Sequence, residues 1–376
     1  MSLSPLDDYP VHQAAEVIRH PATSDRNFYD RYYFMLHSSS DELMMIMGMG
    51  QYPNLSVQDA FALVHRGSLH RVVRASRELG ADRMDLSVGP FRLEVLEGLK
   101  RVRFVLEENG NGLSFDLTWE GAIPAVLEAP QFIRQHERVM FDTQRFAQTG
   151  CWTGTIVVGD ETFAVTPDRW WGTRDRSWGV RPVGPAEPPG IAAAKGTLGA
   201  SAMWNYAPIQ FADSSILYIC SEKPDGSRDL VDAKRVWADP DRPIEHLGEP
   251  EHAHVFIPGT RLISSSTLSF PHAPSGPFEV RVTPLMNTHV GVATGYGRDP
   301  DWGHGYYQGE LVVQGVDHDT ERDQDRFVGL VDSVSRFETG DEVGYGLHEY
   351  LFLGPFPKYR LTGILDGAPG GDGSPS

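Results

Sequence analysis

Short segments in which apolar and polar residues alternate, separated by glycine-rich turns, constrain the fold of this chain most. Apolar residues occupy every second position over residues 91–95, 102–106 and 113–119. A period of two predicts strands that bury one face. Between the last two segments, residues 108–112 read Glu-Asn-Gly-Asn-Gly, residue types that tolerate the positive φ of a hairpin turn. We therefore expect residues 86–120 to form an antiparallel meander.

The rest of the chain shows the same succession of short strand-like segments and turns. Further strands are expected at residues 43–50, 215–220, 253–257, 262–270, 278–284, 306–313 and 345–353. Helical periodicity is scarce, and the clearest candidate is a short helix over residues 57–63 with Ser56 as its N-cap. The 39 glycines and 27 prolines supply many turns. The pattern predicts an all-β sandwich or barrel.

Composition narrows the class of protein and of partner. The 376 residues suit two domains. A net charge of -18 repels phosphate backbones and anionic lipids, so we expect no nucleic-acid partner and no stable membrane insertion. Cys151 and Cys220 are isolated in sequence and indicate neither a disulfide framework nor a zinc–thiolate site. An N-terminus without an apolar segment favours a cytoplasmic protein. The sequence gives no indication of oligomeric state.

The run from residue 170 to residue 181 has the most unusual composition. It holds the tryptophans Trp170, Trp171 and Trp178, the arginines Arg174, Arg176 and Arg181, and one carboxylate, Asp175. On a strand, Asp175 faces the side opposite to its neighbouring arginines. One interpretation is structural, with a tryptophan stacked under an arginine at a barrel end. The other makes Asp175 a general acid beside aromatic faces that stabilise a cation.

These residues carry a resemblance to a known superfamily. The pattern Gly172-x-x-Asp175-x-x-Trp178-Gly179, preceded by the meander and by the segments 92–96, 113–121 and 142–150, resembles the AttH-like and carotenoid-hydratase-like (hydroxyneurosporene synthase type) proteins, in particular their uncharacterised bacterial branch. The resemblance extends over residues 25–365. It implies two consecutive lipocalin-like antiparallel β-barrels packed side by side, with few short helices.

On this basis the chain divides into four parts. We expect an N-terminal extension at 1–24, a first barrel at 25–165, a second barrel at 166–366 and a disordered tail at 367–376. The tryptophan–arginine run then opens the second barrel or lies at the junction between the barrels, where we expect the ligand.

The resemblance does not by itself select an activity. Members of the superfamily include hydratases that add water to an isoprenoid double bond, pericyclase-like enzymes and proteins without known activity, and a fold does not choose among them. This chain also departs from the hydratase-type pattern, which tends to carry histidines around the acid. Here Arg174 and Arg176 flank Asp175, and a neighbouring arginine lowers a carboxyl pKa, whereas protonating an alkene needs a protonated acid.

Other candidate groups lie downstream. In the segment 344–350, Tyr345 and Glu349 share one strand face, and His348 and Tyr350 share the other. The segment is either an acid–base set or an ordinary closing strand. His252-x-His254 is a pair able to chelate a metal, but no third ligand is evident, which makes His254 a pocket or core residue.

Together these features predict a protein that binds a hydrophobic isoprenoid, polyketide or lipid-like molecule. Catalysis, if present, is a cofactor-free hydration, isomerisation or cyclisation; the alternative is a non-catalytic carrier or stress-related binding protein. The candidate catalytic residues are Asp175, Glu349 and His348. The candidate ligand-binding residues are Trp170, Trp171, Arg174, Arg176, Trp178, Arg181, Trp204, Tyr206, His254, Tyr345 and Tyr350. No cofactor or metal is expected.

Overall fold

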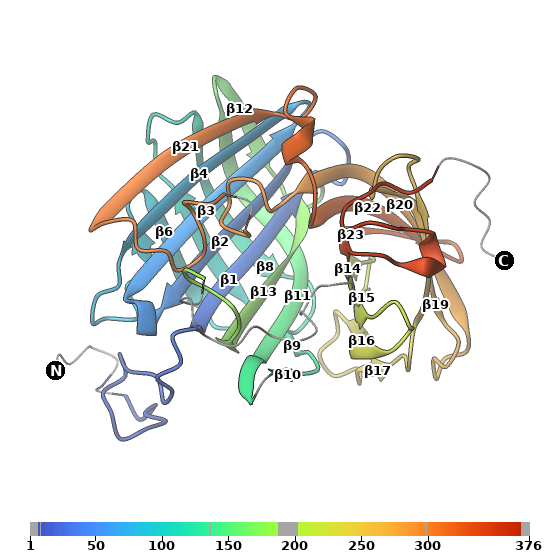
Figure 1. Ribbon diagram of the computed structural model, residues 1–376, viewed down its shortest axis with the longest axis horizontal. Helices are drawn as coiled ribbons and strands as arrows, with labels where there is room; N and C mark the ends of the chain where they lie inside the picture. Colours follow the sequence, from blue (N-terminus) through green and yellow to red (C-terminus); the bar gives the residue numbers. More distant parts are fainter. Residues whose placement is uncertain (1–6, 8, 136, 187–201, 298, 370–376) are drawn as a thin grey trace.

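The protein is built from two antiparallel β-sheets that lie side by side (Figure 1). The computed structural model describes residues 7, 9–135, 137–186, 202–297 and 299–369. One sheet has 14 strands and curls into a nearly closed barrel, and the other has 9 strands and forms a half-barrel. The expected all-β fold of two lipocalin-like barrels is confirmed. In the described residues, no helix is both long and apolar enough to cross a membrane.

The first sheet contains strands from both halves of the chain. Its strands follow the spatial order β21 (Leu311–Asp319), β4 (Leu69–Glu78), β3 (Val57–Arg66), β2 (Met44–Tyr52), β1 (Phe28–His37), β13 (Trp171–Val180), β11 (Arg138–Val158), β8 (Leu113–Gly121), β7 (Arg101–Leu106), β6 (Phe91–Glu97) and β5 (Ser87–Val88). The strands β9 (Val126–Leu127), β10 (Gln131–Gln135) and β12 (Glu161–Val165) also pair with β11. Arg77 of β4 helps to close the barrel, because its Nε donates to the Ser87 carbonyl at 2.6 Å.

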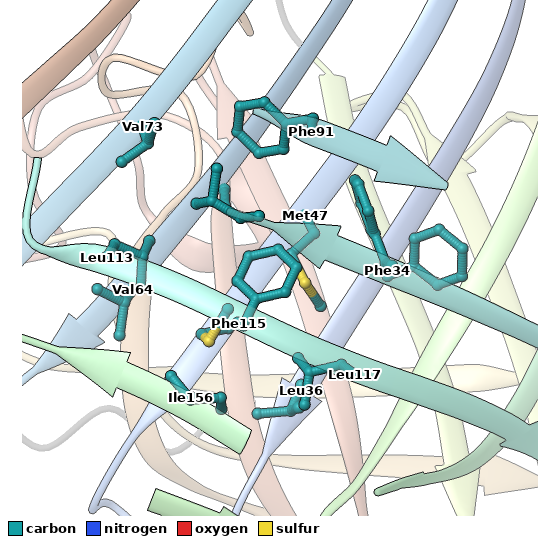
Figure 2. Close-up of a cluster of buried hydrophobic side chains, with 14 of the residues drawn as sticks. Phe34, Leu36, Met47, Val64, Val73, Phe91, Leu113, Phe115, Leu117 and Ile156 are labelled. Atoms are coloured by element: carbon teal, nitrogen blue, oxygen red, sulfur yellow. The ribbon is translucent and has the colours of Figure 1, made fainter. Parts of the chain in front are cut away.

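Apolar side chains fill the interior of this barrel (Figure 2). Phe34 is fully buried, and its ring centroid lies 5.6 Å from that of Trp152 and 5.8 Å from that of Phe104. Figure 2 shows side chains from strands on all sides of the barrel converging on this core, among them Leu36, Met47, Val64, Val73, Phe91, Leu113, Phe115, Leu117 and Ile156. Such packing matches the filled interior of a small barrel.

The second sheet is an open, curved sheet with its own core. Its strands follow the order β17 (Glu245–His246), β16 (Arg228–Trp237), β15 (Ser214–Glu222), β14 (Ala202–Gln210), β23 (Glu342–Leu353), β22 (Val331–Thr339), β20 (Phe278–His289), β19 (Ile263–Phe270) and β18 (Glu251–Phe256). Three 3-10 turns complete the described elements: η2 (Pro53–Leu55), η3 (Gln324–Arg326) and η4 (Pro357–Tyr359). Phe270, Phe337 and Phe352 belong to the buried cluster on the concave side.

Most local predictions hold, but the strand expected at 306–313 begins only at Leu311, as β21, and the predicted helix is wrong. The meander expected at 86–120 is present as β5, β6, β7 and β8. The helix expected at 57–63 is instead the strand β3, in which all positions from Val57 to His65 are buried. Because β3 is covered on both faces, its apolar residues form a continuous run, which periodicity alone does not distinguish from a helix.

The expected division after residue 165 does not coincide with the division between the sheets. β13 lies in the first sheet, where it pairs with β1 on one side and β11 on the other. The two glycines of the sequence pattern permit this close packing, because a Cβ would lie 1.9 Å from the Met35 carbonyl oxygen at Gly172 and 2.0 Å from that of Asp142 at Gly179. β21 also joins the first sheet, against β4.

The expected tail begins with packed residues. The Ala368 N–H donates to the Thr260 carbonyl at 2.7 Å, and its own carbonyl accepts from Gly259 at 2.8 Å. Ala368 is buried. The prediction of a disordered tail therefore does not apply at Ala368, and its remaining part, 370–376, lies outside the described residues.

Candidate functional site

A cavity of about 530 Å³ lies between the two sheets. Its walls come from β1, β11 and β13 of the first sheet and from β14 and β23 of the second. The volume falls in the range of small-molecule sites. Ionisable and aromatic side chains share its lining, including Tyr33, Glu128, Arg145, Asp175, Arg181, Trp204, Tyr206, Tyr296 and Glu349.

Strand register places Asp175 on the cavity side of the first sheet. Asp175 lies opposite Tyr33 of β1 and Ala147 of β11, both of which belong to the cluster between the sheets. The preceding residue, Arg174, lies opposite Phe34 and points into the barrel, where its Nε donates to Gln148 Oε1 at 2.9 Å. The arginines adjacent in sequence are thus on the other face of the strand, as alternation predicts.

A second row of polar groups faces Asp175 from the second sheet. Glu349 lies between Tyr206 of β14 and Asp332 of β22 in the strand register. The Trp204 indole donates to Glu349 Oε1 at 2.5 Å. Across the junction, the Tyr33 hydroxyl donates to Asp332 Oδ2 at 2.5 Å. The two sheets are therefore joined beside the cavity by a hydrogen bond between side chains.

The environment of Asp175 raises the pKa of this carboxyl to near neutrality, so that both its protonated and its ionised forms are populated there. Burial raises the pKa of Asp175 to about 7, the positive charge of Arg145 opposes that rise, and the negative charges of Glu128 and Glu349 add to it. The side chain is half-buried because it borders the cavity. Burial prevails because Arg145 is already paired with Glu128, with 2.5 Å between Nε and Oε2.

Other groups of the site remain uncharged. Burial and the neighbouring Glu349 raise the pKa of Asp332 well above its ordinary value, which favours the protonated form of this carboxyl. Burial also raises the pKa of Tyr206 well above the ordinary tyrosine value, and its hydroxyl has no hydrogen-bond partner among the described residues. The Arg145 guanidinium lies 4.7 Å from the centroid of the Tyr206 ring. The cavity thus offers a neutral acid, a neutral hydroxyl and aromatic faces.

The structure brings five of the sequence-predicted residues together at this cavity: Asp175, Arg181, Trp204, Tyr206 and Glu349. The other predicted residues lie elsewhere. Trp170 and Arg174 face the barrel interior, Trp171 contacts Tyr345 with 6.2 Å between ring centroids, and Arg176 pairs with Asp30 and stacks near Trp178. His254, His348 and Tyr350 lie on the concave side of the second sheet.

Several residues of the site were not identified from the sequence. Glu128, Tyr296 and Asp332 carry no local motif, and Arg145 lies in the segment 142–150 of the resemblance without having been named as a site residue. Asp332 reaches the site through the pairing of β22 with β23, and Arg145 through that of β11 with β13. The only signal that could have found them is strand register, which single sequences do not specify legibly.

The fold and this site define a class: a double lipocalin-like barrel protein with an acid-lined cavity between its barrels. The chain belongs to DUF8625, a family of unknown function, whose model matches residues 3–362. A search of curated proteins finds no match.

One solved structure, the first named here, confirms the fold resemblance. The protein assigned as AttH from Nitrosomonas europaea is 14% identical, with a TM-score of 0.54 over 91% of this chain and 98% of that chain. Kievitone hydratase from Nectria haematococca is 13% identical, with a TM-score of 0.49 over 86% of this chain and 89% of that chain. CghA with Sch210972 is 11% identical, with a TM-score of 0.49 over 88% of this chain and 89% of that chain.

Proposed function

We propose that this protein binds a hydrophobic, unsaturated small molecule in the cavity between its barrels and adds or moves a proton on it without a cofactor. The observation that carries the proposal is Asp175, whose pKa is raised to about 7 at the wall of an aromatic-lined cavity. A general acid works best when its pKa lies near the working pH.

The reaction begins with proton transfer from the Asp175 carboxyl to one carbon of a substrate double bond. The adjacent carbon becomes cationic, and the π faces of Trp204 and Tyr206 stabilise it. In a hydration, water adds to that carbon and its surplus proton passes to Glu349. In an isomerisation, Glu349 instead takes a proton from the neighbouring carbon. In a cyclisation, a second double bond of the substrate attacks the cation before that proton is lost.

Charge balance in the cavity supports this assignment of roles. Arg145 would repel a carbocation if its charge were free, but Glu128 neutralises it. Glu349 accepts a hydrogen bond from the Trp204 indole N–H. This bond holds the Glu349 carboxylate at the wall of the cavity that Asp175 also lines. Asp175 thus acts as the acid and Glu349 as the base.

The first experiment identifies the ligand. Protein purified from its own host is examined by native mass spectrometry, and any bound molecule is extracted into organic solvent and identified. A co-purifying unsaturated polyketide or isoprenoid supplies the substrate for turnover assays. A bound saturated lipid that is recovered unchanged after incubation favours the carrier function instead.

The second experiment tests the acid with Asp175→Asn and a matched control, Asp116→Asn. Asp116 also lies on a strand of the first sheet, but it is paired at the surface with Arg103. We expect Asp175→Asn to lower turnover roughly 100-fold to 10,000-fold while ligand affinity stays close to wild type. The control keeps full turnover. Loss of affinity and stability together in Asp175→Asn would make the residue architectural and reject the catalytic proposal.

A further inference from the structure

Four side chains of metal-ligating types gather on the concave side of the second sheet, away from the cavity between the barrels. Cys220 and Glu222 are two residues apart on β15, and His252 and His254 are two residues apart on β18. Residues two apart on a strand share one face. β15 and β18 are not hydrogen-bonded neighbours, since β18 forms one edge of the sheet and β15 lies near the other. The side chains therefore meet across the open seam of the half-barrel.

The distances suit a single ion. One ligand atom each from Cys220, Glu222 and His252 lies within 4.8 Å of the others, and all three residues are buried. The His254 ring stacks on that of His252, with 4.9 Å between centroids and 19° between planes. His254 is 6% exposed, and its Nε2 has no hydrogen-bond partner among the described residues. Buried polar atoms are rarely left unpaired, so this nitrogen independently indicates a missing ligand.

Metal binding requires one change of protonation in this set. Thiols bind metal ions as thiolates, so the Cys220 thiol must lose its proton, whereas a carboxylate and a neutral imidazole coordinate without losing one.

We propose that Cys220, Glu222 and His252 bind Zn²⁺, with His254 as the fourth ligand, and that the ion fastens the seam between β15 and β18. Zn²⁺ favours four ligands drawn from sulfur, nitrogen and carboxylate oxygen. One thiolate and one carboxylate neutralise its charge. The bond formed is thiolate sulfur to zinc, and the thiol proton passes to solvent.

Residues around the four proposed ligands support a zinc site, but they also lower the zinc affinity that we expect. The Tyr359 hydroxyl lies 2.8 Å from His252 Nδ1, which fixes the ring for coordination through Nε2. Arg228 and Lys358 lie beside the site, with Arg228 Nε 2.9 Å from Glu222 Oε2. Their positive charges weaken binding of a dication, so we expect an affinity below that of zinc fingers.

The test uses the full-length protein and the metal alone. We expect added Co²⁺ to produce a thiolate-to-metal charge-transfer band, and Zn²⁺ to displace it. Because the chain has 2 cysteines, Cys151→Ser is a matched control that keeps the band, whereas Cys220→Ser removes it. Zn²⁺ raises the Tm of wild type and of Cys151→Ser but not that of Cys220→Ser.

Two further variants retain the Cys220 thiol, and they test the site even if Cys220→Ser does not fold. Glu222→Gln and His254→Ala each lower Zn²⁺ affinity at least tenfold in competition with a chromophoric chelator, and wild type releases one proton per Zn²⁺ in weakly buffered solution. A wild-type protein without the cobalt band overturns the proposal. So does Zn²⁺ binding that is equal in wild type, Cys220→Ser and Glu222→Gln, because that metal is bound elsewhere.

Discussion

The two faces of β1 and β13 show how differently one pair of strands can be used. On the inner face, Phe34 packs into a core of apolar side chains. On the outer face, Tyr33 and Asp175 border a cavity lined by ionisable groups. The first barrel is therefore a filled scaffold, and the candidate site lies outside it, against the second barrel. Rigid, well-packed strands hold the acid in place more precisely than a loop would.

The largest loss of stability should come from creating a cavity in the core on the inner face. Phe34→Ala removes a fully buried ring that contacts Phe104 and Trp152, so we expect a loss of about 3–5 kcal/mol in the free energy of unfolding. Chemical denaturation measures it. Val95→Ala, at a side chain that is 45% exposed, is the control and should change stability by less than about 0.5 kcal/mol. A small loss in Phe34→Ala would show that the interior is not tightly filled.

Acid should weaken the fold through histidines buried in neutral form. Burial lowers the pKa of His37 to about 3. Below pH 6.5 the unfolded chain takes up a proton on His37 that the folded chain refuses, so stability falls with pH down to about 3. Between pH 7 and pH 5 this costs about 1–2 kcal/mol, and His37→Gln should reduce the measured drop by that amount. If His37→Gln lost as much stability between pH 7 and pH 5 as wild type, the buried imidazole would be protonated in the folded state without loss of stability.

Asp175, on the same outer face as His37, should show the opposite dependence. Because the pKa of Asp175 is raised to about 7 from 3.8, the folded state holds a proton that the unfolded state has lost between these values, and stability falls as the pH rises through this window. Asp175→Asn removes the effect. Its stability relative to wild type should increase by about 1–2 kcal/mol from pH 5 to pH 7 and then level off. A pH-independent difference would contradict a raised pKa.

The smallest effect concerns the hydrogen bond between the sheets. Tyr33→Phe deletes the hydroxyl that donates to Asp332 and should cost about 1 kcal/mol. Tyr307→Phe, at a side chain that is 58% exposed, is the matched control. Thermal unfolding compares the two variants, and equal Tm values would show that the bond adds nothing at the junction.

The sequence predicted what is local and missed what depends on register. Alternation gave the strands of the meander because each strand buries one face and exposes the other. It also placed Arg174 and Asp175 on opposite faces, as observed. The arginine that acts on Asp175 is instead Arg145 of β11, which no adjacency in sequence reveals. Likewise, the place of β13 in the first barrel depends on close backbone contact at Gly172 and Gly179, a tertiary constraint.

The pairing of β21 with β4 has a consequence for how the chain folds during synthesis. Leu311 lies opposite Arg77, so two segments more than 230 residues apart form one ladder. Until residues 311–319 leave the ribosome, β4 presents an open strand edge, although every other strand of its sheet has already been made. Exposed edges invite pairing with other chains. We expect nascent chains that end before β21 to aggregate, and the first barrel to need nearly the whole polypeptide for its completion.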